Sequence, residues 1–269
     1  MLLQEIVEPL QLENSKEMVT IVGAGGKTST LFMLAKELKS LGKRVLVTTT
    51  TAIYEPVAGD YDRRYTEEIL DFKKKIANLQ VSRSTGEIVV WGRKTHEEGK
   101  LRGINPEDID EIWETRKFSW ILVEGDGARG KNIKAPKAGE PVIPSKTTIL
   151  IGVIGMEVLG KSIEEGIVHR IKHFTEVTGA KEGDEIHEAL LRRLIFHENG
   201  LFKDKPGKAK GILLLNQCED RHTRNRAITF ADGLEISCLV TSLQNQTVYH
   251  AKKTGDFEDP MSLIDKKLL

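Results

Sequence analysis

The sequence predicts an α/β protein in which helices cover both faces of a mostly parallel central sheet. Apolar runs alternate with helical patterns along the chain, as in a parallel sheet with crossover helices. Several runs are near-continuous Val, Ile and Leu, as expected for strands that are buried on both faces. The expected strands are residues 18–22, 44–50, 87–91, 120–124, 148–154, 211–216 and 236–241.

Residues typical of helix ends place the helices between these strands. The first expected helix, 27–41, closes at Gly42, because glycine commonly follows a helix end. Asn105 and Pro106 are the expected cap and first residue of a second helix, and Asp184 the expected cap of a helix running to about residue 196. No linker or repeat divides the chain, so we expect a single domain over residues 1–269, with a short N-terminal segment, 1–16, packed on it.

Composition narrows the range of partners. Lys and Arg number 40 and so do Asp and Glu, and a net charge of zero gives no electrostatic reason to expect nucleic acid or membrane binding. No apolar run approaches the roughly 18 residues of a membrane span, and the N-terminus has no signal-peptide pattern. The two cysteines, Cys218 and Cys238, have no metal-binding spacing. We therefore expect a cytoplasmic protein.

The most informative motif joins the first expected strand to the first expected helix. A strand, a glycine-rich turn, Lys-Thr and a helix bind nucleotide phosphates, because glycines let backbone N–H groups close around the anion and the helix N-terminus adds positive charge. The motif predicts a P-loop NTPase-like fold with ATP or GTP and Mg²⁺ as cofactors. Lys27 is expected to face solvent and reach the phosphates, and Thr28 to ligate Mg²⁺. The expected phosphate-binding residues are Gly23, Ala24, Gly25, Gly26, Lys27, Thr28 and Ser29.

This motif departs from the standard phosphate loop at one position. Ile21 stands where the standard pattern has its first glycine. What remains is G-x-x-G-K-T, a shorter loop known from Mur-type ligases and some related ATPases. The alternative is an ordinary strand-to-helix turn with a solvated lysine.

A pair of carboxylates follows the expected strand 120–124. Glu124 and Asp126 are one residue apart, and in a phosphate-loop protein an acid at this position holds Mg²⁺ or orients the attacking water. We predict Thr28, Asp126 and Glu124 as metal ligands, and Lys27, Glu124 and Asp126 as catalytic residues. Asp126 is the favoured ligand, because its flanking glycines let the backbone approach a ligand closely. The alternative is a strand that ends in an Asp-Gly turn.

Residues 128–147 show little helix or strand pattern and hold several cations. Long segments of this kind inside compact domains are usually functional or disordered, and this one follows the predicted metal acid, at the sheet edge where ligands bind in open α/β folds. It predicts a second anionic substrate, and the alternative is a solvated basic loop. The expected contacts of this second anion are Arg129, Lys131 and Lys134, with Thr49, Thr50 and Arg170 added.

Three of these expectations have plain alternatives. Thr49 and Thr50 end a strand, where β-branched residues are favoured anyway. His169 and Arg170 read as part of a solvated helix. Asn216 opens Asn-Gln-Cys-Glu, which resembles the guanine-reading N-K-x-D motif with two substitutions, so Asn216 is a candidate base contact or simply the end of a strand.

Taken together, the motifs resemble the YqeC-like selenium cofactor biosynthesis proteins, which are accessory proteins of selenium-dependent molybdenum hydroxylases. The resemblance covers roughly residues 15 to 245 and implies a P-loop fold with a role in supplying or installing a selenium centre. A small selenium compound or an apo-hydroxylase is then the implied partner. Many relatives have alanine at the position of Gly125, and the change leaves both carboxylates in place. The motifs are, in order, V-G-A-G-G-K-T-S, V-T-T-T-T, K-L-R-G-I, L-V-E-G-D-G-A, K-A-P, E-P-V-I-P, G-V-I-G, V-H-R and L-L-N-Q.

Three functions are compatible with these residues. The first is an enzyme that hydrolyses a nucleotide or transfers its phosphoryl group during selenium cofactor assembly. The second is an accessory protein whose affinity for a partner is switched by the bound nucleotide. The third is a Mur-like ligase, for whose additional domains the chain is short.

Overall fold

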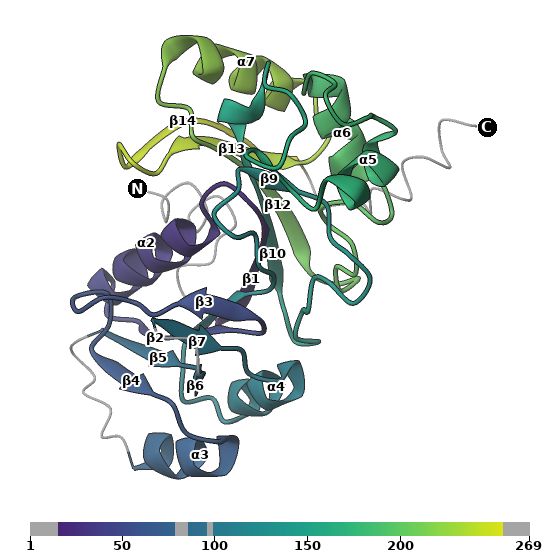
Figure 1. Ribbon diagram of the computed structural model, residues 1–269. Helices are drawn as coiled ribbons and strands as arrows, with labels where there is room; N and C mark the ends of the chain where they lie inside the picture. Colours follow the sequence, from purple (N-terminus) through teal and green to yellow (C-terminus); the bar gives the residue numbers. More distant parts are fainter. Residues whose placement is uncertain (1–15, 79–85, 96–98, 255–269) are drawn as a thin grey trace. The chain divides into compact units, whose positions relative to one another are not determined.

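The computed structural model describes residues 16–78, 86–95 and 99–254 (Figure 1). Within them the protein is α/β and its main strands are mostly parallel, which confirms the expected class at this level. The chain divides into two compact units: the first includes 28–127 and 142–149, the second 22–27, 128–141 and the residues from 150 onward. Each unit is described by itself. The single domain stays a prediction, and the N-terminal segment up to residue 15 lies outside the described residues.

The first unit is built on parallel strands in the order β1-β8-β2-β5-β4. Every residue of β2 and β8 is buried, which explains why residues 45–47 and 120–123 form continuous apolar runs rather than alternating patterns. The last two residues of β1 belong to the second unit. The bounds are β1 Glu17–Gly23, β8 Trp120–Glu124, β2 Arg44–Thr49, β5 Glu87–Trp91 and β4 Arg63–Tyr65.

Helices and a small antiparallel sheet complete the first unit. The sheet has the order β3-β7-β6. In the hydrophobic core, the ring of Phe72 stacks on that of Trp91 with centroids 4.2 Å apart, so that α3 is anchored on β5. The bounds are α2 Lys27–Ser40, α3 Ile69–Ala77, α4 Pro106–Glu114, β3 Ala52–Tyr54, β7 Lys100–Arg102 and β6 Arg93–Lys94.

The second unit has the strand order β14-β13-β12-β10 (Figure 1). β12 and β13 are parallel, whereas β14 is antiparallel to β13. Strands β9 and β11 form a separate parallel pair. β9 contains two residues of the cation-rich segment 128–147, called the basic segment below, and β11 contains His169. The bounds are β10 Ile149–Gly155, β12 Lys210–Asn216, β13 Ser237–Ser242, β14 Thr247–Lys252, β9 Ile133–Lys134, β11 Val168–His169, α5 Ile171–Thr178, α6 Glu188–Phe196, α7 Arg221–Asp232 and the short 3-10 helix η1 Met156–Val158.

The predicted strands are present, with ends that differ by at most one residue, and the helix predicted at Lys27 ends at Ser40. Two local predictions are wrong. Helix α6 begins at Glu188, and the Asp184 carboxylate instead accepts a hydrogen bond from the Lys181 N–H in a turn of its own. His169 lies in strand β11 rather than in a helix, because the pattern there extends over too few residues to separate the two. None of the described helices has the length and apolar character that crossing a membrane requires.

Candidate functional site

The glycine-rich loop adopts a backbone that only glycine tolerates well. Gly23, Gly25 and Gly26 have φ angles of 95°, 88° and 129°. A Cβ atom on Gly25 would lie 2.3 Å from the backbone nitrogen of Gly155. The three glycines are therefore required by the shape of the loop and by its close packing on the end of β10.

Two backbone N–H groups of the loop are already hydrogen-bonded inside the second unit. The Ala24 N–H donates to the carbonyl of Val153 at 3.0 Å, and the Gly25 N–H donates to the carbonyl of Lys131 at 3.1 Å. Phosphate binding through Ala24 and Gly25 stays a prediction, and it would require these N–H groups to exchange their partners. The loop leads directly into the N-terminus of α2 at Lys27.

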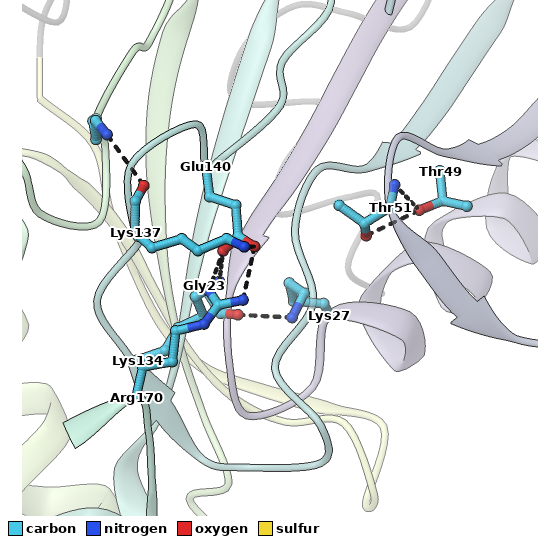
Figure 2. Close-up of polar contacts among 9 residues, drawn as sticks. Gly23, Lys27, Thr49, Thr51, Lys134, Lys137, Glu140 and Arg170 are labelled. Atoms are coloured by element: carbon cyan, nitrogen blue, oxygen red, sulfur yellow. Dashed lines mark hydrogen bonds and ion pairs between the residues drawn. The ribbon is translucent and has the colours of Figure 1, made fainter. Parts of the chain in front are cut away.

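Lys27 was expected to face solvent, and this is wrong. The residue is only 5% exposed, and its Nζ donates to the carbonyl of Gly23 at 2.7 Å (Figure 2). A buried ammonium group needs acceptors, and the loop supplies one from its own first glycine. The lysine therefore folds back over the glycine turn rather than extending from it.

Asn216 braces the loop from the end of β12. Its Nδ2 donates to the Gly25 carbonyl at 2.8 Å, and its Oδ1 accepts from the Leu243 N–H at 3.0 Å and from the Thr241 hydroxyl at 3.2 Å. A Cβ atom on Gly26 would lie 2.4 Å from Asn216 Nδ2. The contact of Asn216 with a nucleotide base stays a prediction; what the structure places there is a support for the glycine turn.

In the first unit, Thr28 and Glu124 meet at the end of β8. The Thr28 hydroxyl donates to Glu124 Oε2 at 2.7 Å, although the two residues are 96 positions apart in the sequence. Glu124 is 6% exposed and Asp126 is 2% exposed. The sequence favoured Asp126 as the metal ligand, but Glu124 is the carboxylate that contacts the hydroxyl of the loop.

Thr49 and Thr50 hold the same strand end in place. The Thr49 hydroxyl donates to the carbonyl of Glu124 at 3.0 Å, and the Thr50 N–H donates to the same carbonyl at 3.1 Å. The Thr50 hydroxyl donates to the carbonyl of Val142 at 2.7 Å. Both threonines thus have backbone partners in the first unit, and their predicted role in binding a second anion is untested.

The described residues contain no cluster of three or more His, Cys, Asp or Glu side chains suited to a metal ion. Mg²⁺ does not need one, since it is usually bound through one or two protein oxygens and keeps water and phosphate oxygens as its other ligands. A threonine hydroxyl beside a carboxylate is a donor set of this kind. Thr28 and Glu124 therefore fit the predicted Mg²⁺.

The structure brings two of the predicted anion-binding cations together, on a residue to which the sequence assigned no role. Lys134 Nζ lies 3.0 Å from Glu140 Oε2, and Arg170 donates through Nη2 to Glu140 Oε1 at 2.8 Å and through Nη1 to Oε2 (Figure 2). Arg129 is exposed, and Lys131 Nζ contacts the carbonyl of Gly166 at 3.4 Å. The E-P-V-I-P motif, which begins at Glu140, was the only signal in the sequence for this carboxylate.

These charges shift two pKa values. Burial alone would raise the pKa of Glu140, but the hydrogen bond from Arg170 and the charge and hydrogen bond of Lys134 outweigh it and lower the pKa to about 2. Burial, together with the charges of Arg170, Lys134 and Arg129, lowers the pKa of His169 to about 4. His169 is therefore neutral and Glu140 ionised at neutral pH.

Comparison with known proteins gives one consistent match. A family model described as "YqeC protein" matches residues 19–172, more than half of the chain. A protein of Escherichia coli (strain K12) named "Uncharacterized protein YqeC" is 32% identical over 228 residues, which are 81% of this chain and 86% of that protein. The matched region includes the glycine loop, the acidic end of β8 and the residues around Glu140.

Proposed function

The chain belongs to the YqeC family, and on this premise we propose that it is a P-loop NTPase-like protein that binds ATP or GTP with Mg²⁺. In this proposal it hydrolyses the nucleotide or transfers its phosphoryl group, and it acts in selenium cofactor biosynthesis or in the maturation of selenium-dependent molybdenum hydroxylases. The selenium role rests on the sequence motifs alone. The nucleotide role also has support from the geometry of the site.

One observation carries the nucleotide proposal. The Thr28 hydroxyl, which directly follows the loop lysine, donates to Glu124 Oε2 at 2.7 Å. A hydroxyl at the start of the helix and a carboxylate at the end of a buried strand are the two oxygen donors expected beside the phosphates of a bound nucleotide. An ordinary strand-to-helix turn gives no reason for these two residues to meet.

Each side chain of the proposed nucleotide site has a separate role. Lys27 holds a positive charge within the glycine turn, where it can exchange the Gly23 carbonyl for a phosphate oxygen. The N-terminus of α2 would contribute its N–H groups and its dipole to the same anion. Thr28 and Glu124 would hold Mg²⁺, which neutralises charge on the phosphate oxygens. Asp126, which is 2% exposed near the end of β8, is the residue that we propose for orienting an attacking water.

A nucleotide-dependent switch is the second candidate, and one observation favours it. The glycine loop is bonded directly to the basic segment, because the Gly25 N–H donates to the carbonyl of Lys131. A change in the loop upon phosphate binding would therefore reach the segment that carries Lys131 and Lys134. The segment would then present its cations differently to a small selenium compound or to an apo-hydroxylase.

A nucleotide-binding panel tests the proposal. We expect ATP or GTP to raise the melting temperature more with Mg²⁺ than without it, since a ligand at 100 times its Kd adds about 2.7 kcal/mol. Lys27→Ala should remove this shift, whereas Glu124→Gln should remove only the part that depends on Mg²⁺. If neither nucleotide shifts the wild-type protein at millimolar concentration, the nucleotide proposal fails.

Turnover separates the enzyme from the switch. A phosphoryl-transfer enzyme should be stimulated by a small selenium compound, and a switch should be stimulated by its protein partner. Cells that carry Lys27→Ala should lose selenium-dependent hydroxylase activity under both readings. Normal hydroxylase activity in these cells would refute the cellular role.

A further inference from the structure

Glu140 is held by two cations in the manner of a bound anion. The guanidinium fork of Arg170 contacts both carboxylate oxygens, and Lys134 contacts one of them from a side chain with no exposed surface. Lys137 adds a third, more distant charge at 3.9 Å. Arginine forks of this kind match two oxygens of a carboxylate or a phosphate equally well. The arrangement therefore has the geometry of an oxyanion site that a protein carboxylate fills.

The two cations lie in or next to regular secondary structure, whereas the Glu140 carboxylate lies in a turn. Lys134 lies in strand β9, and Arg170 directly follows β11, the strand paired with β9, and precedes α5. Glu140 lies in a turn, in which its N–H donates to the Lys137 carbonyl and Gly139 has a φ of 73°. Glu140 can thus leave the cations without breaking a strand or a helix.

Arg170 has an unusual backbone conformation at this point. Its φ and ψ are 62° and 67°, in the left-handed region that side chains other than Gly, Asn and Asp rarely adopt. Such a conformation is strained and tends to persist at functional sites. Here it coincides with a guanidinium group that is directed at an anion rather than at solvent.

The surroundings of this pair favour more negative charge than one carboxylate supplies. His169, the residue before Arg170, is 8% exposed. After burial, the largest effects on its pKa are the charges of Arg170, Lys134 and Arg129, which lower it, while Glu140 offsets them only in part. The local potential is therefore positive even with Glu140 in place.

We infer that Lys134 and Arg170 form the binding site of a doubly charged oxyanion of the phosphate class, and that Glu140 is a tethered competitor which this ligand displaces. A tethered group acts at an effective concentration on the order of millimolar or above. A free carboxylate carries the same single charge as Glu140 and has no tether, so it would not displace Glu140 from the two cations. A dianion gains more from two or three cations than Glu140 does. The inference rests on the proposed function in that it names the class of the second ligand.

The test uses inorganic phosphate and no nucleotide, so that it can fail independently of the nucleotide proposal. Glu140→Gln removes the competing charge and keeps the side-chain shape. Glu165→Gln is the matched control, because it makes the same change in net charge at an exposed glutamate of the same unit. Calorimetric titration should give a phosphate Kd for Glu140→Gln that is about tenfold or more below that of Glu165→Gln. Adding Arg170→Gln should reverse the gain, and Glu140→Gln should bind phosphate more tightly than acetate.

Several results of these measurements would contradict the inference. If Glu140→Gln binds phosphate no better than Glu165→Gln, or if it binds acetate as tightly as phosphate, the inference is wrong. If Glu140→Gln is poorly folded, phosphate should restore its melting temperature, and a failure to restore it would count against the inference. At pH 8, where inorganic phosphate is a dianion, saturating phosphate should shift the imidazole NMR resonances of His169 in the wild-type protein, and unchanged resonances would overturn the inference.

Discussion

Replacing Thr28 with valine removes one hydrogen bond from the site and changes little else. Valine keeps the branched shape of threonine, but the donor to Glu124 Oε2 at 2.7 Å is lost. A hydrogen bond to a charged group contributes about 1.5–3 kcal/mol. Thr28 is half-buried, so we expect a loss of about 2 kcal/mol, or roughly 4–8 °C in melting temperature for a chain of this size.

Thr28→Val should also uncouple Mg²⁺ from the nucleotide. We expect the ratio of nucleotide affinities with and without Mg²⁺ to fall by about tenfold, which corresponds to about 1.4 kcal/mol. Thr28→Ser keeps the hydroxyl and should retain both stability and Mg²⁺ dependence. The assay is urea unfolding, followed by fluorescence titration with ATP and GTP. If Thr28→Val binds Mg²⁺-nucleotide as the wild type does, the pair of Thr28 and Glu124 is a structural contact and the proposed metal site is wrong.

Two further predictions concern the second unit. Asn216→Ala removes three buried hydrogen bonds, to Gly25, Thr241 and Leu243. At about 1 kcal/mol each, urea unfolding should show a loss of about 3 kcal/mol in the free energy of unfolding. An unchanged free energy of unfolding would mean that the glycine turn does not depend on the Asn216 side chain. His169 has a folded pKa of about 4, below its ordinary value of 6.5, so the unfolded chain binds the proton first. Its contribution to stability should be complete above pH 6.5 and be lost as the pH falls from 6.5 to 4. His169→Gln should show a flatter pH dependence of unfolding in that window, and an identical slope would contradict the shifted pKa.

The main strands were predictable because burial on both faces of a sheet produces continuous apolar runs in the sequence. β2 and β8 are buried along their whole length, and residues 45–47 and 120–123 are continuously apolar. β14 and α7 contain no such run. All residues of β14 are half-buried, and α7 buries only Ala227, Phe230 and Ala231 on an otherwise polar helix. Elements with so narrow an apolar face are recognised from their packing partners rather than from their own residues.

The site was predictable where chemistry depends on adjacent residues, and not where it depends on distant ones. The glycine loop and the acidic strand end are local motifs, and both are present as strand-to-helix and strand-to-turn junctions. The contact of Arg170 with Glu140 joins residues 30 positions apart, in segments without periodicity. The burial of Lys27 was equally hidden, because whether a lysine extends or folds back depends on the acceptors around it. Residue types therefore indicated the chemistry, and the fold determined which charges meet.

The backbone bonds of the glycine turn have a consequence for the kinetics and thermodynamics of ligand binding. The N–H groups of Ala24 and Gly25 are held by Val153 and Lys131, so the turn is ordered before a nucleotide arrives. A preordered loop loses little conformational entropy when its ligand binds, but a phosphate that binds to these two N–H groups must first displace their carbonyl partners. These two amides should accordingly exchange slowly with deuterated water before any nucleotide is added. A loop that first wraps around its ligand would behave in the opposite way, with fast exchange that slows only on binding.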